Sequence, residues 1–409
     1  MNNKTNPTQK NIFEYIDSDT SILKLVSKVK TDAITDEIQQ IFDYQTYDGQ
    51  VVEEIAIPKF PDNYQIGLII GSSGSGKSTI LKKAFAEEEI VKWDPSIAIA
   101  SHFNSFQEAS DRFGAVGLNS IPTWLKPFDA LSNGEKFRAD LARKLKNNAS
   151  IDEFTSVVNR EVAISCSCSI EKYIRKHDLH GITFCSCHDD IIPYLRPDWI
   201  YNTDTHEFYN GRYLCRPKIH IDIVSCNRKA WDMFKRFHYL SGELNQSSIC
   251  FLGLYNDIPI SFLSVLAFPR KGLVHAWREH RIVVLPDYQG MGVGTGMSDA
   301  IAQAFISKGC RYFSKAANPR IGEHREHSPY WRATSRNKNT RHDYFDKNGN
   351  ARGNDKYRMN DEMMKYHSNR MCYSHEYIGD GTTYPYTLKK ENDNMQLEIS
   401  DFVDGICMR

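Results

Sequence analysis

The sequence lacks the long apolar run that a membrane-spanning helix needs. No stretch approaches the roughly 20 consecutive apolar residues that cross a bilayer, and the first residues, MNNKTNPTQKN, lack the apolar core of a secretory signal. Without such a signal, the ten cysteines are expected as free thiols in a reducing compartment. These absences predict a cytoplasmic protein that has no membrane partner and carries no pore of its own.

The sequence also lacks an excess of either charge. The 51 Lys and Arg residues balance the 51 Asp and Glu residues, so the net charge predicts no partner. The stretch from Lys308 to Arg370 departs from this balance, with 15 basic against 7 acidic residues and aromatic residues among them. It is the best candidate for a surface that binds DNA, RNA or another polyanion, although a solvated face of an ordinary domain has the same composition.

The 409 residues suffice for two or three domains, and 41% apolar residues indicate globular ones. Strand-like and helix-like segments alternate twice along the chain, which predicts two α/β domains. We expect a polar extension over residues 1–45, with short helices such as one at 22–29. The first domain is predicted over 46–212, the second over 213–380, and a polar tail over 381–409.

A glycine-rich turn follows the apolar segment Ile66–Ile70 and precedes a helix expected over Thr79–Phe85. The turn fits the pattern GxxxxGK[ST] in the strand-to-helix context that this pattern requires. Glycines let backbone amides curl around phosphates, and the helix N-terminus adds its positive end. We therefore predict an ATP site with Mg²⁺, in which Lys77 reaches the phosphates and Ser78 ligates the metal. The predicted nucleotide-binding residues are Gly71, Ser72, Ser73, Gly74, Ser75, Gly76, Lys77, Ser78 and Thr79.

Three further motifs follow in order. The run Leu131–Arg143 begins Leu-Ser-Asn-Gly-Glu, Asp152 and Glu153 come next, and His188 ends an apolar segment that starts at Ile182. Together with the glycine-rich turn, they resemble the signature, Walker B and switch-histidine elements of the ABC ATPases. The resemblance covers about residues 46–212 and implies a P-loop nucleotide-binding domain of ABC type.

The resemblance implies a role for each of these residues. Asp152 would hold Mg²⁺ through water, Glu153 would orient or deprotonate the attacking water, and His188 would contact the γ-phosphate. Ser132 and Gly134 suit a phosphate but cannot reach the nucleotide of their own domain in this fold. The resemblance therefore implies an ATP-dependent head-to-tail homodimer.

The first domain also departs from the family pattern. Asn133 stands where the first signature glycine is usual, and Glu135 replaces the usual glutamine. No convincing Q-loop is present, which argues against a transporter subunit and favours the soluble ABC ATPases. Two Cys-Ser-Cys runs, at Cys166–Cys168 and Cys185–Cys187, could supply four thiolates to zinc, but buried small residues are the favoured interpretation.

A second glycine-rich loop follows the segment Arg281–Pro286. Its sequence, Gln-Gly-Met-Gly-Val-Gly-Thr, resembles the acyl-CoA-binding loop of the GNAT acyltransferases, and a helix over Thr295–Lys308 follows it. Amides at the start of that helix would bind the pyrophosphate of acetyl-CoA or another acyl-CoA. The resemblance implies a GNAT-like mixed α/β domain with the cofactor-binding residues Gln289, Gly290, Gly292, Gly294 and Thr295.

Acyl transfer needs a positioned amine and a base. Glu279 and His280 precede the loop, where the family often places a base, and one of the two should face the cleft because strand neighbours alternate. Tyr330 is a possible acid for the departing thiolate. An amphipathic helix predicted over residues 231–241 ends near His238 and Tyr239, and a basic-aromatic segment contains Trp331 and Arg332.

These four residues give a distant similarity to Mom-type phage proteins, which are GNAT relatives that modify adenine in DNA. Aromatic and arginine side chains of this kind could stack a flipped base and pair its phosphates, although His238 could simply cap or pack. Glu279, His280 and Tyr330 could each equally be a surface or packing residue. The leading interpretation of the whole chain is an ABC-type ATPase fused to a GNAT-type N-acyltransferase that acts on a nucleic-acid or protein amine. An ATP-switched nucleic-acid clamp with an inactive GNAT module is the alternative, and a transporter subunit is the least favoured one.

Overall fold

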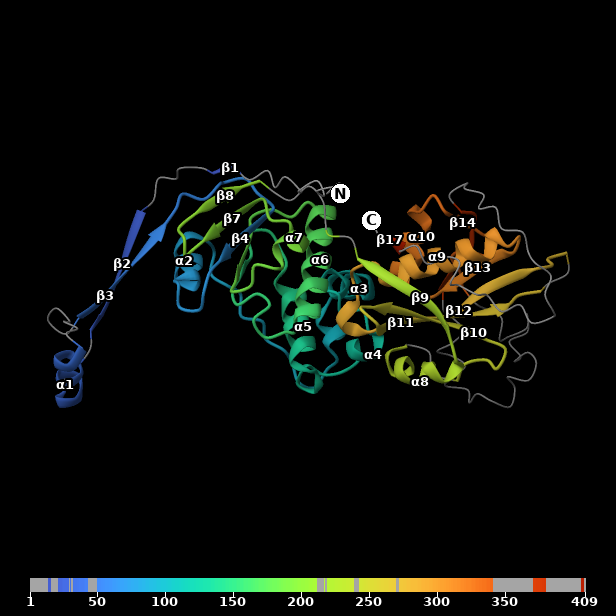
Figure 1. Cartoon of the computed structure of the whole chain (residues 1–409), viewed down its shortest axis with the longest axis horizontal. Helices are drawn as coiled ribbons and strands as arrows, with labels where there is room; N and C mark the ends of the chain where they lie inside the picture. The colour runs from blue at the N-terminus through green and yellow to red at the C-terminus, as the bar shows by residue number, and fades with distance from the viewer. Residues whose placement is uncertain are drawn as a thin grey trace, which may run out of the picture. The chain divides into compact units, whose positions relative to one another are not determined.

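The computed structural model describes residues 14–15, 21–28, 30, 32–42, 50–211, 217, 219–238, 243–269, 272–340, 371–379 and 406–407. The chain forms two compact units (Figure 1). The first comprises Met1–Leu118 and Leu125–Pro217, and the second comprises Asn119–Trp124 and Lys218–Arg409. None of the helices in these described ranges is both long and apolar enough to cross a membrane.

A two-stranded ribbon precedes the glycine-rich turn. Strand β2 (Ser21–Lys28) pairs with β3 (Gln50–Ile57) in antiparallel register, and α1 (Ala33–Phe42) lies between them in the sequence. The helix predicted over residues 22–29 is therefore wrong. The apolar residues of this segment find partners in β3, more than 20 positions away, and such pairing stabilises a strand whatever the local pattern favours.

The first unit is built on a six-stranded sheet in the order β1-β8-β7-β4-β6-β5. The four strands from β7 to β5 are parallel, and β8 and β1 continue the sheet in antiparallel register. The central strand β4 is buried along its whole length, which explains its continuous apolar sequence. The strands are β1 (Glu14–Tyr15), β4 (Ile66–Ile70), β5 (Ser150–Ile151), β6 (Ile182–Ser186), β7 (Trp199–Asn202) and β8 (Phe208–Asn210).

Helices cover both faces of this sheet. In Figure 1, α2 lies on one side, while α3, α5 and α6 gather on the other. Ile80 and Leu81 of α2 pack in one core cluster with Trp199 and Tyr201 of β7. Besides α1, the helices of the first unit are α2 (Lys77–Ala84), η1 (Ile99–His102), α3 (Phe106–Ala115), η2 (Phe128–Ala130), α5 (Asn133–Lys144), α6 (Arg160–Lys176) and α7 (Ile192–Leu195).

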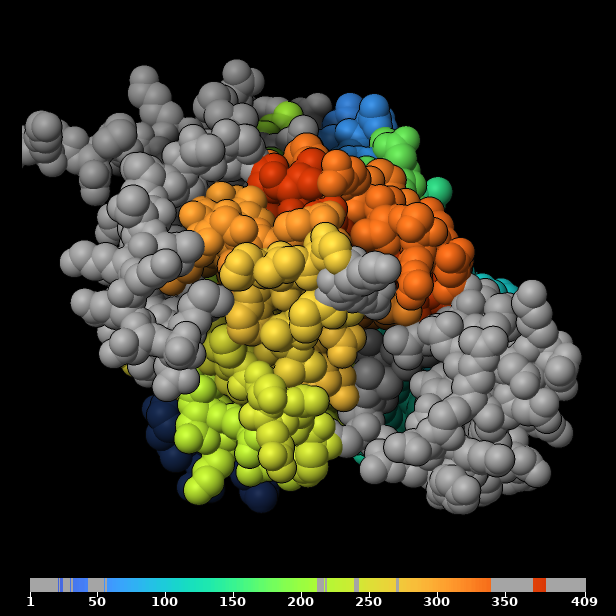
Figure 2. Space-filling view, turned by 90° about the vertical axis from the view of Figure 1, so that its right-hand side faces the viewer, coloured from blue at the N-terminus to red at the C-terminus, as the bar shows by residue number. Residues whose placement is uncertain are grey.

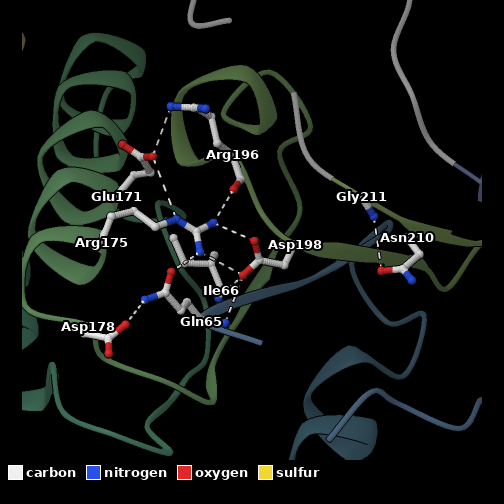
Figure 3. A network of polar contacts seen from close by, with 9 residues as sticks. All are labelled: Gln65, Ile66, Glu171, Arg175, Asp178, Arg196, Asp198, Asn210 and Gly211. Carbon is white, nitrogen blue, oxygen red and sulfur yellow. Dashed lines mark hydrogen bonds and ion pairs between the residues drawn. The ribbon is translucent and has the colours of Figure 1, made fainter. Parts of the chain in front are cut away.

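A polar network fixes the amino ends of β4 and β7 (Figure 3). Arg175 of α6 donates to both carboxylate oxygens of Asp198, at 2.8 and 2.9 Å. Asp198 in turn accepts the backbone N–H groups of Gln65 and Ile66, at 2.9 and 3.0 Å. Burial acts to raise the pKa of Asp198, but these bonds hold it below its usual value. The ion pair between Arg175 and Asp198 thus fixes the start of β4, the strand that leads to the glycine-rich turn.

The second unit is built on a nine-stranded sheet in the order β14-β16-β13-β12-β11-β10-β9-β17, with β15 also paired to β16. Among the described strands, β12 and β13 pair in parallel and the other neighbours pair antiparallel. The strands are β9 (His220–Cys226), β10 (Ile249–Tyr255), β11 (Ile258–Ala267), β12 (Ala276–Val284), β13 (Arg311–Ala316), β14 (Trp331–Ala333), β15 (Asn339–Thr340), β16 (Met371–Tyr377) and β17 (Ile406–Cys407).

Helices α9 (Val293–Ser307) and α10 (Pro319–His327) cover one face of this sheet, and α8 (Trp231–Phe234) covers part of the other (Figure 1). Phe305 of α9 packs in a cluster with Leu263, whereas Phe234 of α8 packs with Phe262, the preceding residue of β11. The single helix predicted over residues 231–241 is corrected to three short pieces. These are η3 (Arg228–Ala230), α8 and η4 (Lys235–Phe237).

Candidate functional site

The glycine-rich turn after β4 has the backbone of a phosphate-binding loop. Gly74 and Gly76 have φ values of 84° and 89°, which residues other than glycine rarely adopt. Gly76 is the N-cap of α2, so the amide groups of the first helical turn point into the loop. The Lys77 ammonium donates to the carbonyl oxygens of Gly71 and Ser72, at 2.9 and 2.6 Å. A cation and a row of amide donors within one loop fit a nucleotide phosphate chain.

Two residues that the sequence analysis missed hold this loop from outside. Asp204 accepts both the backbone N–H and the hydroxyl of Ser72, each at 2.7 Å. The Thr203 hydroxyl lies 2.5 Å from that of Ser75. Both residues follow β7, and nothing in their local sequence marks them, because their role depends on β7 pairing beside β4.

The two predicted carboxylates follow β5. Strand β6 lies between β5 and the loop strand β4, so His188, two residues beyond the end of β6, follows the intervening strand. Burial raises the pKa of the Cys185 thiol, the carboxylates of Asp152 and Glu153 raise it further, and Lys77 lowers it. The structure thus gathers the lysine of the loop and both carboxylates around one thiol.

The predicted switch histidine is held by a residue that was not predicted. The Thr155 hydroxyl lies 3.2 Å from Nδ1 of His188, and Thr155 has a φ of 72°, which is rare for a β-branched residue. Burial lowers the pKa of His188. A neutral imidazole with one nitrogen held by a hydroxyl is free to bond a phosphate through the other nitrogen.

The signature-like segment forms a helix N-terminus. Ser132 is the N-cap of α5, and its hydroxyl accepts the backbone N–H of Glu135 while the Glu135 carboxylate accepts the backbone N–H of Ser132. This capping box explains why glutamate suits a position where the family usually has glutamine. Gly134 lies in the first turn of the same helix. The amide groups of this turn remain suited to an anion.

Of the cysteines considered for zinc, Cys166, Cys168 and Cys185 are buried and Cys187 is exposed. In the part of the chain that the structure describes, no three metal-binding side chains form a cluster. Cys166 and Cys168 lie on α6 and Cys185 lies on β6, where they pack as small apolar residues.

The sheet of the second unit is split between its two parallel strands. Strands β12 and β13 pair only through Ala276–Arg278 and Arg311–Phe313. From Glu279 onward β12 pairs only with β11 among the described strands, while β13 continues beside β16. A gap in backbone pairing therefore opens at Glu279.

A β-bulge lies at the point where the strands part. Ser264 pairs with Arg281 and Val265 pairs with Glu279, so His280 has no partner on β11. Bulges re-aim side chains and are common beside active sites. Glu279 is therefore the first residue of β12 beyond its pairing with β13, and His280 is the bulged residue. These are the two neighbours that were predicted as alternative bases.

The second glycine-rich loop follows β12. Gly292 is the N-cap of α9 with a φ of 96°, and a Cβ on Gly294 would meet Val284 at 3.2 Å, so the helix start lies close against β12. The Gln289 side chain donates to the Val284 carbonyl and accepts the backbone N–H of Asn119, at 2.8 and 2.9 Å. Thr295 donates to the Gly292 carbonyl. Side-chain hydrogen bonds at the start of the loop and a left-handed N-cap residue at its end thus fix the conformation of the loop.

Glu279 points away from the gap, into the side covered by α9. Its side chain is 6% exposed and its carboxylate lies 3.0 Å from the guanidinium of Arg325, which is 2% exposed. Ser298 donates to the same carboxylate at 2.7 Å, and Ser314 donates at 3.2 Å. A carboxylate with these partners is a structural ion, and the prediction of Glu279 as a base is therefore corrected. Arg325 was not predicted, because a core arginine has no sequence signature.

His280 faces the opposite side. Its Nε2 atom is buried and has no hydrogen-bond partner among the described residues. Burial lowers the pKa of His280 to about 4, and the charges of Arg281 and Arg278 act in the same direction. His280 is therefore neutral near pH 7 and keeps a nitrogen that can accept a proton.

The remaining predicted residues are placed unequally. His238 also acts on the pKa of His280, so the two histidines lie near each other, whereas Tyr239 lies outside the described residues. Tyr330 is 40% exposed. Trp331 is 5% exposed and donates to Asp299 at 2.7 Å, so it is a core residue and its predicted role in stacking a substrate is corrected. Arg332 is exposed and pairs with Glu376.

These arrangements define two classes of domain in one chain, as the sequence predicted. The first unit has a mixed α/β fold in which β6 separates β4, the strand before the glycine-rich turn, from β5, the strand before Asp152 and Glu153. The second has a split sheet with a glycine-rich loop, and residues 216–325 match the model of the Acetyltransferase (GNAT) family. The chain therefore carries, in the order that the sequence predicted, an α/β unit with a phosphate-binding loop and a unit that matches the GNAT family model over residues 216–325.

Solved structures are similar to each part. A dimeric ATP-binding cassette with ADP and phosphate bound matches 39% of this chain and 89% of its own length, at 14% identity and a TM-score of 0.30. The ribosomal-protein-S18-alanine N-acetyltransferase from Escherichia coli matches 41% of this chain and 99% of its own, at 13% identity and a TM-score of 0.27. A GNAT acetyltransferase from Elizabethkingia anophelis with acetyl-CoA bound matches 39% and 98%, at 13% identity and a TM-score of 0.24. No curated protein matches the sequence.

Proposed function

We propose that the second unit transfers an acyl group from acyl-CoA to an amine in a nucleic acid or a protein, with His280 as the base. The observation that carries this proposal is the coincidence of the bulge at His280 with the point where β12 and β13 part. The glycine-rich loop follows the other end of the same strand. One strand edge thus links a base to a site for pyrophosphate.

The chain's own groups suit each part of acyl-CoA. The amides of the loop and of the first turn of α9 would bind the pyrophosphate, with Gly292 and Gly294 leaving room for it. Among the described strands, β12 has β11 as its only neighbour from Glu279 to Val284, a length of about 20 Å at 3.3 Å per residue, and backbone groups along its other edge would bond the extended arm of the donor. This arrangement would bring the thioester to the bulge.

The reaction then needs one base. The acceptor nitrogen attacks the thioester carbonyl carbon, the C–S bond breaks, and CoA departs as a thiolate that takes up a proton. Nε2 of His280 would accept the proton that the nitrogen loses, because the imidazole is neutral near pH 7. Tyr330 remains the proposed acid for the thiolate.

The test is acyl transfer by the full chain carrying His280→Gln. We expect a loss of at least about 100-fold in rate, the lower range for a general base, with acyl-CoA affinity unchanged. The exposed His220 on β9 provides the matched control, His220→Gln, which should leave the rate unchanged. Wild-type rates should stay level from pH 8 to 6 and fall as the pH approaches the pKa of about 4. Equal rates for His280→Gln and the wild type would refute the assignment.

The glycine-rich loop provides a separate test of donor binding. We expect Gly294→Val to abolish acyl-CoA binding, because even a Cβ at this position would press against Val284 at 3.2 Å. If the wild-type chain bound no acyl-CoA, the ATP-switched clamp with an inactive second unit would replace the acyltransferase interpretation.

We propose that the first unit binds and hydrolyses Mg-ATP in a head-to-tail homodimer. Lys77 would hold the phosphates, and Ser78 and Asp152 would hold Mg²⁺, which offsets phosphate charge when bound. Glu153 would act on the attacking water and His188 on the γ-phosphate, while Ser132 and Gly134 of the partner copy would close the site. Glu153→Gln with ATP should trap a dimer, and Lys77→Ala should abolish turnover. An unchanged ATPase rate in Lys77→Ala would exclude this site.

A further inference from the structure

Two arginine–phenylalanine pairs lie side by side in the second unit. The Arg278 guanidinium lies 5.6 Å from the ring centroid of Phe268, and that of Arg311 lies 5.1 Å from the ring centroid of Phe313. The two rings are 5.7 Å apart and tilted by 55°. Cation–π attraction holds each guanidinium over its ring. These four residues and Arg332 are called the arginine–phenylalanine strip below.

The strip lies on the face opposite α9 and α10. Arg278 and Phe313 are direct register partners across β12 and β13, so their side chains point to the same side. Their strand neighbours Trp277 and Tyr312 pack in the α9 cluster on the other side. In Figure 2 the segments that carry the strip, coloured from yellow to orange, adjoin one another and the red strand β16.

The strip continues across β16 to Arg332. Glu376 is the register partner of both Phe313 and Arg332, and its carboxylate binds Arg311 at 2.6 Å and Arg332 at 2.9 Å. One carboxylate therefore holds two guanidinium groups in line with the aromatic rings. The Arg311 and Arg332 side chains remain 51% and 65% exposed, so solvent reaches both.

The other end of the strip reaches the proposed base. The charges of Arg278 and Arg281 act on His280, so both arginines lie near the bulge. Four of the described arginines, including Arg281, thus share this face, and the Glu376 carboxylate pairs with two of them. The surplus of positive charge favours an anionic acceptor. The half-buried phenylalanine rings add flat apolar faces at the same level.

We propose that the arginine–phenylalanine strip binds single-stranded nucleic acid and presents a base amine to His280. Guanidinium groups bind backbone phosphates, and bases stack on aromatic faces and on the guanidinium planes that such rings support, without regard to sequence. An acidic peptide matches the charge but gives the two rings nothing flat to stack on, so the pairing of rings with arginines favours the nucleic acid. This inference rests on the proposed acyltransferase function and names its acceptor class.

The test is a fluorescence-anisotropy titration of the full chain with a short labelled single-stranded DNA of mixed sequence, at several KCl concentrations. Arg332→Gln leaves Glu376 paired with Arg311, so the fold should persist. We expect it to weaken binding and to reduce the slope of log K against log[KCl] by about 0.7, the value for one phosphate contact on a single strand. Phe268→Leu should weaken binding by about 5- to 100-fold, the effect of one lost stack, with the slope unchanged.

Lys229→Gln is the matched control, because Lys229 is exposed beyond β9, three strands from β12. It should bind like the wild type. The proposal fails if Arg332→Gln and Phe268→Leu bind as tightly as this control, or if polyglutamate competes as well as DNA does. Acyl-CoA binding measured calorimetrically on the same proteins separates the two hypotheses. Retained acyl-CoA binding without DNA binding overturns only the acceptor, whereas loss of both overturns the acyltransferase proposal.

Discussion

The buried pair of Glu279 and Arg325 gives a prediction that separates a structural role from a catalytic one. Replacing Glu279 with Gln removes the charge that compensates a guanidinium only 2% exposed. Breaking a buried ion pair from one side costs about 3–5 kcal/mol, because the remaining charge stays in a medium of low polarity. In a unit of this size, each kcal/mol shifts the midpoint by about 2–4 °C, so we expect a fall of about 6–20 °C.

Differential scanning calorimetry of the full chain measures this shift, and Mg-ATP, the proposed ligand of the first unit, should identify the transition of that unit by raising its midpoint. Asp232→Asn is the control, since Asp232 and its partner Lys235 are both exposed and such pairs contribute about 1 kcal/mol or less. Arg325→Met combined with Glu279→Gln should cost less than the sum of the two single changes. If Glu279→Gln left the midpoint unchanged but abolished acyl transfer, Glu279 would be the base and the assignment of His280 would be wrong.

Two further changes test other sites. Burial raises the pKa of Asp299 to about 6, so the folded protein favours the neutral acid. Ionisation of Asp299 therefore destabilises the fold. This destabilisation is absent below the usual pKa of 3.8 and complete above about pH 6. Asp299→Asn keeps an acceptor for the Trp331 N–H but cannot ionise. We expect it to raise the free energy of unfolding, measured by urea titration, by about 1–3 kcal/mol at pH 8 but not at pH 3.5. An equal gain at the two pH values would contradict this cause. Glu135→Gln keeps the acceptor of the capping box and removes a negative charge beside Ser132. We therefore expect tighter ATP-dependent dimerisation in sedimentation experiments. Weaker dimerisation would exclude a phosphate at the start of α5.

Local chemistry explains which features the sequence could predict. The P-loop depends on glycines followed by a lysine, and its backbone follows from those residues alone. The apolar segment Ile66–Ile70, expected as the strand before this turn, is β4 with the same bounds. The fold classes of both units were predicted from such short patterns.

Features that depend on distant partners could not be predicted. β2 was mistaken for a helix because its partner strand lies across α1 in the sequence. Trp331 reads as an exposed aromatic among basic residues, yet Asp299 of α9 accepts its N–H in the core. Asp204 supports the P-loop only because β7 pairs with β4. In each case the deciding contact joins segments that no sequence window contains.

The choice between Glu279 and His280 shows the same limit at the scale of one residue. Alternation predicts that neighbours face opposite sides, and they do, but it does not say which side is the cleft. The bulge changes the alternation: Trp277 and Ile282 both pack toward α9, although five positions separate them and a regular strand would place them on opposite faces. The Glu279 side chain can thus form the core ion pair on the α9 side of β12, while the His280 side chain lies on the arginine-rich face. A one-residue deletion that removed the bulge would restore regular alternation, and it would force either the ion pair or the apolar contacts of β12 onto the wrong side of the sheet. The bulge is therefore the feature that lets one strand serve both the core and the proposed site.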